Sequence, residues 1–381
     1  MTGSWLMKAR VTSMPSPRQR ASRRGALTTP YDSAPERAFW RRAVSSKDAK
    51  TLLIGNPPTW LDRTTRIVTA GSCFAQHIGR HLRSEGFLLI DAEPAPSVVP
   101  RPLWEQFGYG LYSARYGNIY SARQLLQLLE EALGRRSMRT IIWRDAVGRH
   151  YDALRPSISP GGLSSEEQIR TSRSHHLNRI AGALESADAF VFTLGLTECW
   201  IDTESGSALP SAPGVFAGSF ELRKAAFHNF NYDEVLSDLE DACKLLWSVN
   251  SRMSILLTVS PVPLVATATG DHVVVASMHS KAILRAAAGA LAVAHPQVTY
   301  FPSYEIIQTP PYGVRYFEPD LRSVSAAGID AVMHQLFRDS ESTSTGDRLP
   351  ASNSSEDDVE ASVICDEEAL EEIASQIDIP T

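Results

Sequence analysis

The sequence predicts an α/β domain with three layers, in which helices cover both faces of a parallel β-sheet. Short, nearly continuous apolar runs alternate along the chain with longer segments that have helical spacing. Strands of a sheet covered on both faces have this apolar composition, and the helices between them provide the parallel connections. The chain has 381 residues, of which 43% are hydrophobic, and this is enough for a large core.

The predicted elements follow one another in a regular order. Strands are predicted at five short apolar runs, residues 66–70, 88–91, 189–194, 254–260 and 298–301. Helices are predicted at six segments with an apolar stripe, residues 73–85, 121–133, 165–186, 232–248, 276–294 and 326–337. The regions 92–120 and 201–231 are predicted to be long loops, which in α/β domains often carry substrate contacts.

The two ends of the chain differ from its middle. Residues 1–30 contain six Lys or Arg and no acidic residue, whereas residues 339–381 contain thirteen Asp or Glu and one Arg. Polar, charged stretches of this kind do not bury enough apolar surface to fold. We therefore expect a basic, mostly disordered arm over 1–49, the folded domain over 50–338, and a disordered acidic tail over 339–381 that is available to a protein partner.

Composition excludes several classes of function. Residues 31–338 carry 30 basic and 30 acidic residues, so the body lacks the basic surface that nucleic-acid binding requires. The four cysteines form no CxxC pair, which argues against a zinc site and a disulfide scaffold and favours a reducing compartment. No secretory signal and no apolar stretch of ~20 residues is present, so a cytoplasmic protein without a membrane span is expected. No P-loop or GxGxxG follows a strand, and no cofactor is expected.

Three unusual stretches directly follow predicted strands. They are GSC at 71–73, GLTECW at 195–200 and SPVP at 260–263. The carboxyl ends of parallel strands lie at the same edge of a sheet, and ligands bind at that edge. The sequence therefore predicts a functional site where these three stretches converge.

Ser72 is the main candidate for chemistry at this edge. At the start of a helix, unpaired backbone N–H groups and the helix dipole stabilise an anion, and a serine there attacks an acyl carbon if a base removes its proton. The alternative is that Ser72 is simply the N-cap of the helix. Cys73 is either a reactive thiol or a small buried side chain. His77 and His81 have i,i+4 spacing, but a polar helix face explains them and no metal site is expected.

Several motifs occur in an order that points to a known family. GSCFA at 71–75 is followed by YGNIYSARQLLQLL (116–129), FTLGLTECW (192–200), LTVSPVPL (257–264), SKAILRAA (280–287) and YFPSYEI (300–306). The chain resembles the GSCFA family over about residues 60–338, and that family is similar to the SGNH/GDSL hydrolases. The resemblance implies an SGNH- or flavodoxin-like sandwich that hydrolyses or transfers the acyl group of a small-molecule or carbohydrate acyl ester.

The resemblance also implies roles for individual residues. Ser72 resembles the SGNH nucleophile, with its own N–H, Gly117 and Thr197 as donors to the oxyanion. Thr197 stands where SGNH enzymes carry an asparagine. We expect the Ser72 hydroxyl to face a cleft shared with these donors. Substrate contacts are expected from Asn118, Glu198 and Trp200.

One part of the SGNH machinery is missing from the sequence. The final Asp-x-x-His motif reads DLRS, so Asp320 is present and Ser323 replaces the histidine. His272 is the first candidate for the replacement base, because it lies next to an aspartate on a loop after a strand; His279 and His228 rank below it. Without a base a serine is a weak nucleophile. The alternative function is therefore a non-catalytic module that binds a glycan or an acyl group.

Overall fold

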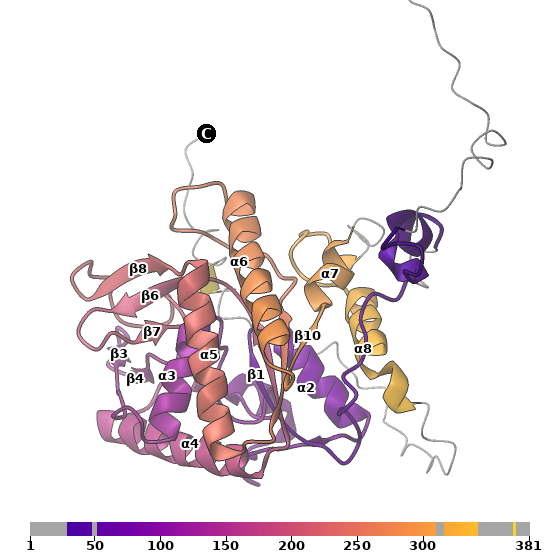
Figure 1. Ribbon diagram of the computed structural model, residues 1–381. Helices are drawn as coiled ribbons and strands as arrows, with labels where there is room; N and C mark the ends of the chain where they lie inside the picture. Colours follow the sequence, from indigo (N-terminus) through magenta and orange to yellow (C-terminus); the bar gives the residue numbers. More distant parts are fainter. Residues whose placement is uncertain (1–28, 48–51, 310–315, 342–368, 371–381) are drawn as a thin grey trace, which may run out of the picture. The chain divides into compact units, whose positions relative to one another are not determined.

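The computed structural model describes residues 29–47, 52–309, 316–341 and 369–370 (Figure 1). The chain divides into two units, residues 1–52 and 53–381. In the first unit, the described residues form a 3₁₀ turn at Glu36–Ala38 and a π-helical turn at Arg41–Ser45. The predictions of disorder for residues 1–28, 342–368 and 371–381 lie outside the described residues.

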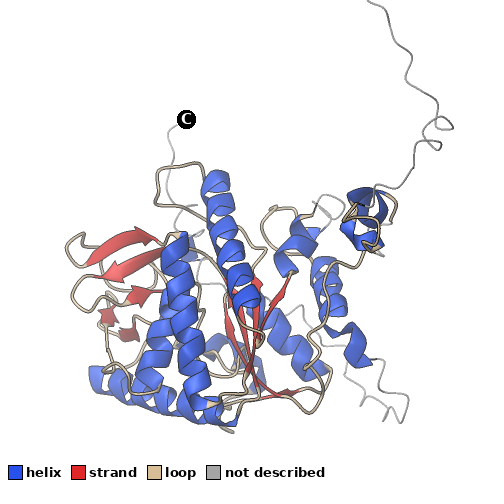
Figure 2. Cartoon of the chain, in the orientation of Figure 1, coloured by secondary structure: helices blue, strands red, loops and turns tan. Residues whose placement is uncertain are grey.

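A five-stranded parallel sheet forms the centre of the second unit (Figure 2). Its strand order is β10–β9–β5–β1–β2, and every neighbouring pair is parallel. The strands are β1 (Arg66–Gly71), β2 (Leu88–Leu89), β5 (Ala189–Leu194), β9 (Ser254–Val259) and β10 (Val298–Phe301). All five correspond to predicted strands, although β2 is only two residues long.

Helices occupy the predicted segments between these strands. They are α2 (Phe74–Ser84), α3 (Ala122–Ala132), α4 (Glu166–Ser186), α5 (Tyr232–Val249), α6 (Val273–Ala294), α7 (Ser303–Gln308) and α8 (Ala326–Glu341), of which only α7 was not predicted. Ser121 and Asn231 begin α3 and α5 with capping boxes, which satisfy the first backbone N–H groups of each helix. None of the helices within the described ranges combines the length and apolar character that crossing a bilayer requires.

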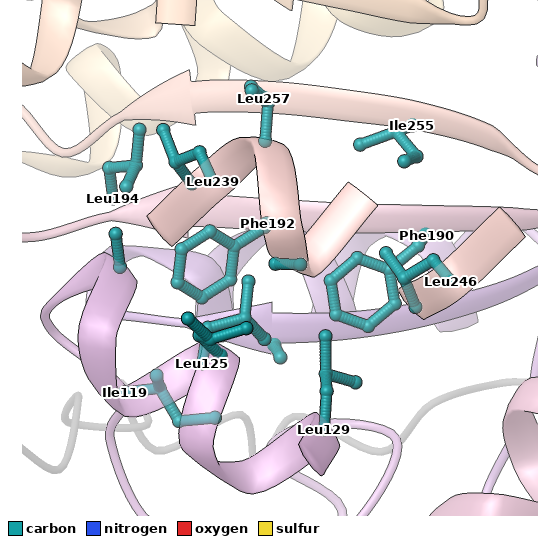
Figure 3. Packing of buried hydrophobic residues seen from close by; sticks show 14 of the residues in the cluster. Ile119, Leu125, Leu129, Phe190, Phe192, Leu194, Leu239, Leu246, Ile255 and Leu257 are labelled. Carbon is teal, nitrogen blue, oxygen red and sulfur yellow. The ribbon is translucent and has the colours of Figure 1, made fainter. Parts of the chain in front are cut away.

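The helices cover both faces of the sheet. Because successive strand side chains point to opposite faces, Phe190 and Phe192 of β5 lie on the same face and pack with residues of α3 and α5 (Figure 3). Residues of α4 and α6 belong to the same cluster. Val191 of β5 and Leu256 of β9 belong to a second cluster with α2, α7 and α8. The predicted three-layer α/β/α sandwich is therefore confirmed.

Two small antiparallel sheets lie in the connections. β3 (Ile142–Arg144) pairs with β4 (His150–Asp152), and β6 (Glu198–Asp202) pairs with both β7 (Ala208–Leu209) and β8 (Ala225–Asn229). The region 201–231, predicted as a long excursion, contributes the short strands β7 and β8, which were not predicted. The region 92–120 contains only the short 3₁₀ turns Arg101–Leu103 and Glu105–Phe107.

Candidate functional site at the carboxyl edge of the sheet

The structure brings together the residues that follow β1, β5 and β9, as the sequence predicts. Ser72, Gly195 and Ser260 are the first residues after these strands. A small cavity of about 10 Å³ lies between them, with room for about one water molecule. Its wall is completed by Cys73, Tyr120, Leu196, residues 262–264 and Lys281.

The Ser72 side chain is buried beside this cavity. Ser72 is 1% exposed, and its Oγ has no hydrogen-bond partner among the described residues. The N-cap of α2 is Cys73, and no side chain caps the helix, so the interpretation of Ser72 as an N-cap is wrong. The expectation that the hydroxyl faces an open cleft is also wrong in this conformation. Most buried hydroxyls in proteins are hydrogen-bonded. Ser72 is one of several described hydroxyls here that are not, together with those of Thr69 and Thr193 on the adjoining strands, but of these three only Ser72 lines the cavity.

The backbone N–H groups around Ser72 are engaged within the fold. The N–H of Ser72 donates to the Thr193 carbonyl oxygen at 3.0 Å, continuing the pairing of β1 with β5. The N–H groups of Gly195 and Leu196 both donate to the Tyr120 carbonyl oxygen, at 2.9 and 3.2 Å. The Ser72 N–H, an oxyanion donor that the family resemblance implies, is thus engaged within the sheet in this conformation.

The other two predicted oxyanion donors do not line the Ser72 cavity. The Thr197 N–H donates to Ser280 Oγ at 2.9 Å, and its hydroxyl donates to Asn229 Oδ1 at 2.7 Å. Gly117 has a φ of +70° and lies against Ser157 in a separate small cavity. The positive φ explains why a glycine stands there. Neither residue is among the described residues that line the Ser72 cavity.

The predicted substrate-binding residues have structural partners. Asn118 is buried, and its Oδ1 lies 2.5 Å from the Tyr112 hydroxyl. Glu198 accepts hydrogen bonds from the Thr267 hydroxyl at 2.7 Å and from a backbone N–H of the same loop. Trp200 packs edge-on against two phenylalanine rings. Glu198 therefore anchors the loop before α6, and none of the three lines the Ser72 cavity.

Asp320 and His272 also lie away from this cavity. Asp320 accepts hydrogen bonds from the Ser323 hydroxyl at 2.6 Å and from the N–H groups of Arg322 and Ser323. Burial raises the pKa of Asp320, but the hydrogen bonds from Ser323 and Arg322 outweigh it and lower the pKa. His272 is exposed and caps α6, with Nδ1 accepting the Val274 N–H at 3.2 Å. The aspartate is thus bonded to the serine in the histidine position, and neither residue is among the described residues lining the cavity.

The remaining histidines and cysteines suggest no metal site. His228 pairs with Glu234 at 2.8 Å, and His279 is exposed on α6. Burial lowers the pKa of His77 to about 4, and the His81 ring stacks on that of Phe337. Within the described ranges, no group of three His, Cys, Asp or Glu side chains is arranged to hold a metal ion.

Lys281 is the residue of this site that the sequence analysis did not identify. It lies on α6 with Ser277 and Ser280, at the i, i+3 and i+4 positions of one helix face. Ser277 Oγ accepts the Leu264 N–H at 3.1 Å, and Ser280 Oγ accepts the Thr197 N–H. Lys281 Nζ donates to the Gly195 carbonyl oxygen at 2.5 Å. One face of α6 therefore holds the loops after both β5 and β9.

A buried polar network holds the loop that carries Tyr120, one of the residues lining the Ser72 cavity. The His176 Nδ1 lies 2.6 Å from Glu93 Oε2, and the His176 ring contacts the edge of Tyr116. Arg155 donates to the Arg115 carbonyl oxygen at 3.3 Å. These contacts fix residues 115 and 116, which precede Tyr120 in the cavity wall.

The network predicts a loss of stability in mild acid. Burial, reinforced by the charge of Arg155, lowers the pKa of His176 from 6.5 to about 4. Between these values the unfolded chain binds a proton that the folded protein excludes, so the free energy of unfolding falls as the pH is lowered from about 6.5 to 4. His176 contributes at most about 1.4 kcal/mol per pH unit to this slope.

The control for this prediction is His176→Gln, which cannot titrate. Urea unfolding at several values between pH 7 and 4 should give a shallower pH slope for the variant than for the wild type. Equal slopes would contradict the assignment to His176.

The fold and the edge of its sheet define the class of the protein. It is a three-layer α/β protein whose candidate site is a serine between the first strand of the sheet and the helix that follows. The chain belongs to the GSCFA family, because the sequence model of that family matches residues 66–336. This match confirms the resemblance on which the motif assignments depend. A search of curated proteins found no match to the chain.

Three solved structures are similar to the chain. A family 3 carbohydrate esterase from Talaromyces cellulolyticus has 11% identity and a TM-score of 0.34, over 74% of this chain and 98% of that one. An acetyl esterase mutant with an acetate ion has 12% identity and a TM-score of 0.33, with the coverage again 74% and 98%. A family 3 carbohydrate esterase from Clostridium thermocellum has 13% identity and a TM-score of 0.26, over 72% and 94%.

Proposed function

We propose that the chain is an acyl-ester hydrolase or O-acyltransferase of the SGNH type, with Ser72 as its nucleophile. The observation that carries the proposal is the buried Ser72 hydroxyl without a hydrogen-bond partner, beside a cavity at the carboxyl edge of the sheet. A structural serine would use its hydroxyl to cap α2 or to bond a neighbour, whereas a nucleophile keeps its oxygen available for the substrate. The family resemblance supports an O-acylated carbohydrate as the substrate.

Substrate entry requires the outer wall of the cavity to move. Leu196, Val262 and Pro263, which line the cavity, are half-exposed. The present cavity of about 10 Å³ holds about one water and is too small for an acyl group. We propose that residues 260–264 shift outward to admit the ester.

The second candidate function is a non-catalytic module that binds a glycan or an acyl group. Its specific support is the engagement of the donors that the SGNH mechanism needs. The Thr197 hydroxyl is bonded to Asn229, and the Ser72 N–H is bonded within the sheet. Asp320 is bonded to Ser323 instead of orienting a histidine.

Labelling with a fluorophosphonate distinguishes the two functions, because it modifies only an activated serine. We expect the wild-type protein to be labelled at Ser72, and the label to vanish in Ser72→Ala. Turnover of a generic acetyl ester should fall by about 1,000-fold or more in this variant.

The matched control is Ser113→Ala. Ser113 is also buried near β1, but its hydroxyl accepts the Thr69 N–H at 2.9 Å and lies outside the cavity. Labelling should persist in this variant. An unlabelled wild-type protein at every pH between 6 and 10 would reject the esterase and leave the binding module.

A further inference from the structure

The Lys281 side chain is buried, which is unusual for a lysine. It is 3% exposed, on the face of α6 that packs toward the sheet. Lysines are almost never fully buried unless their charge is compensated or used. Its ammonium or amine group donates a hydrogen bond to the Gly195 carbonyl oxygen at 2.5 Å.

Gly195 lies next to both Ser72 and Lys281. A Cβ atom added to Gly195 would lie only 3.1 Å from Ser72 Cβ, so the glycine backbone packs directly on the serine. The carbonyl of the same glycine holds Lys281 Nζ. Ser72 and Lys281 therefore reach the same cavity from two sides of Gly195.

We propose that Lys281 is the general base that accepts the proton of the Ser72 hydroxyl, in the role that the SGNH enzymes give to histidine. This inference rests on the proposed function and supplies the base that the sequence lacks. It replaces His272 in that role, because His272 is exposed and caps α6.

The proton and electron transfers balance without any other group. As Ser72 Oγ attacks the ester carbon, the neutral amine of Lys281 takes the hydroxyl proton, and the carbonyl π electrons move to oxygen. The tetrahedral intermediate collapses by breaking the bond to the alcohol oxygen, which receives the proton from the Lys281 ammonium. Water or an acceptor alcohol then attacks the acyl-serine and loses its proton to Lys281. The bond between the acyl carbon and Ser72 Oγ breaks, and Lys281 returns the proton to Oγ, which regenerates the serine.

The surroundings of Lys281 suit this role. A lysine acts as a base only when neutral, and burial disfavours the charged form of a lysine. The Gly195 carbonyl accepts a hydrogen bond from either form and so keeps Nζ in position. The cavity has room for about one water, through which the hydroxyl and the amine can exchange a proton before substrate draws them together. The other titratable side chains that line the cavity are Cys73 and Tyr120.

The test measures the rate of Ser72 labelling by a fluorophosphonate, with the site verified by peptide mass. Lys281→Met and Lys281→Arg should both label at least about 100-fold more slowly than the wild type. Arginine can donate to the Gly195 carbonyl but does not lose its proton in proteins, so it restores a structural contact and not a base. The matched control is Lys244→Met, which removes an exposed lysine of α5 and should leave the rate unchanged.

The outcomes separate the two proposals. A wild-type rate in Lys281→Met, or recovery of that rate in Lys281→Arg, overturns the role of Lys281 as base and leaves Ser72 as the nucleophile. A wild-type protein that is never labelled overturns the proposed function and this inference with it.

A second test uses the wild-type protein alone, so it does not depend on whether the Lys281 variants fold. The charge of the Lys281 amine is read by side-chain nitrogen-15 NMR across the same pH range. The inference predicts that the amine becomes neutral over the pH range in which labelling accelerates. An amine that stays charged throughout that range overturns the inference.

Discussion

Gly71→Ala is expected to lower the free energy of unfolding by roughly 3 kcal/mol or more. Gly71 has a φ of +143°, and an added Cβ would lie 2.6 Å from the Thr193 carbonyl oxygen and 2.7 Å from its nitrogen. Both atoms belong to the backbone of β5, so no side chain can turn away to relieve the contact. Alanine therefore forces β1 and β5 apart at the point where Gly71 is opposite Thr193. Urea unfolding followed by circular dichroism measures the loss.

Gly182→Ala is the matched control, because the same methyl group has the opposite effect there. Gly182 is exposed in α4, and an added Cβ meets no atom within 4 Å. Alanine in an exposed helix interior stabilises by about 1 kcal/mol relative to glycine. A Gly71→Ala protein as stable as the wild type would show that β1 and β5 do not meet at this glycine.

Asp152→Asn is expected to destabilise the protein by about 3–5 kcal/mol. The Asp152 carboxylate bonds the Arg155 Nε at 2.8 Å and lies 3.7 Å from Arg173 Nη1. Burial raises the pKa of Asp152, but the charges of Arg173 and Arg155 outweigh it and lower the pKa, so the group is ionised at neutral pH. The neutral amide removes the negative charge that the Asp152 carboxylate places beside the buried guanidinium groups of Arg155 and Arg173. Thermal and urea unfolding both measure the effect.

Glu166→Gln is the control for charge removal at the surface. Glu166 pairs with Arg144 at 2.7 Å, but the two side chains are 43% and 62% exposed to solvent. Pairs of this kind contribute about 0–1 kcal/mol. Comparable losses in Asp152→Asn and Glu166→Gln would contradict the view that burial makes the Asp152 network important for stability.

The sheet and its helices were predictable because their signals are local. For example, the apolar run before Gly71 predicts a strand without reference to any other part of the chain, and so does the apolar run of β5. The short strands β6, β7 and β8 carry no such signal. Trp200 of β6 pairs with Leu209 on one side and Phe227 on the other, and only the tertiary fold creates that register.

The position of Ser72 was predictable, but its surroundings were not. Parallel strands end at one edge, so the convergence of Ser72, Gly195 and Ser260 follows from the strand pattern. The partner of the Thr197 hydroxyl does not follow from it. Asn229 lies 32 residues further along the chain and is brought to Thr197 by the pairing of β6 with β8.

His272 and Lys281 show the limits of reasoning from neighbours in the sequence. An adjacent aspartate made His272 the favoured base, yet the start of α6 uses its ring as a cap. Lys281 stands in the sequence SKAIL of a helix, and a lysine in a helix commonly extends to solvent. The available signal was the pattern of Ser277, Ser280 and Lys281 on one helical face, which is unusual for the buried side of a helix.

The contacts of α6 have a consequence for how the cavity opens. The segments that follow β9 and β5 are both hydrogen-bonded to side chains of α6, namely Ser277, Ser280 and Lys281. A slide or tilt of α6 would break the hydrogen bonds to both segments at once. Any opening of the cavity that moves α6 is therefore expected to affect both segments together, because both are bonded to the same helix.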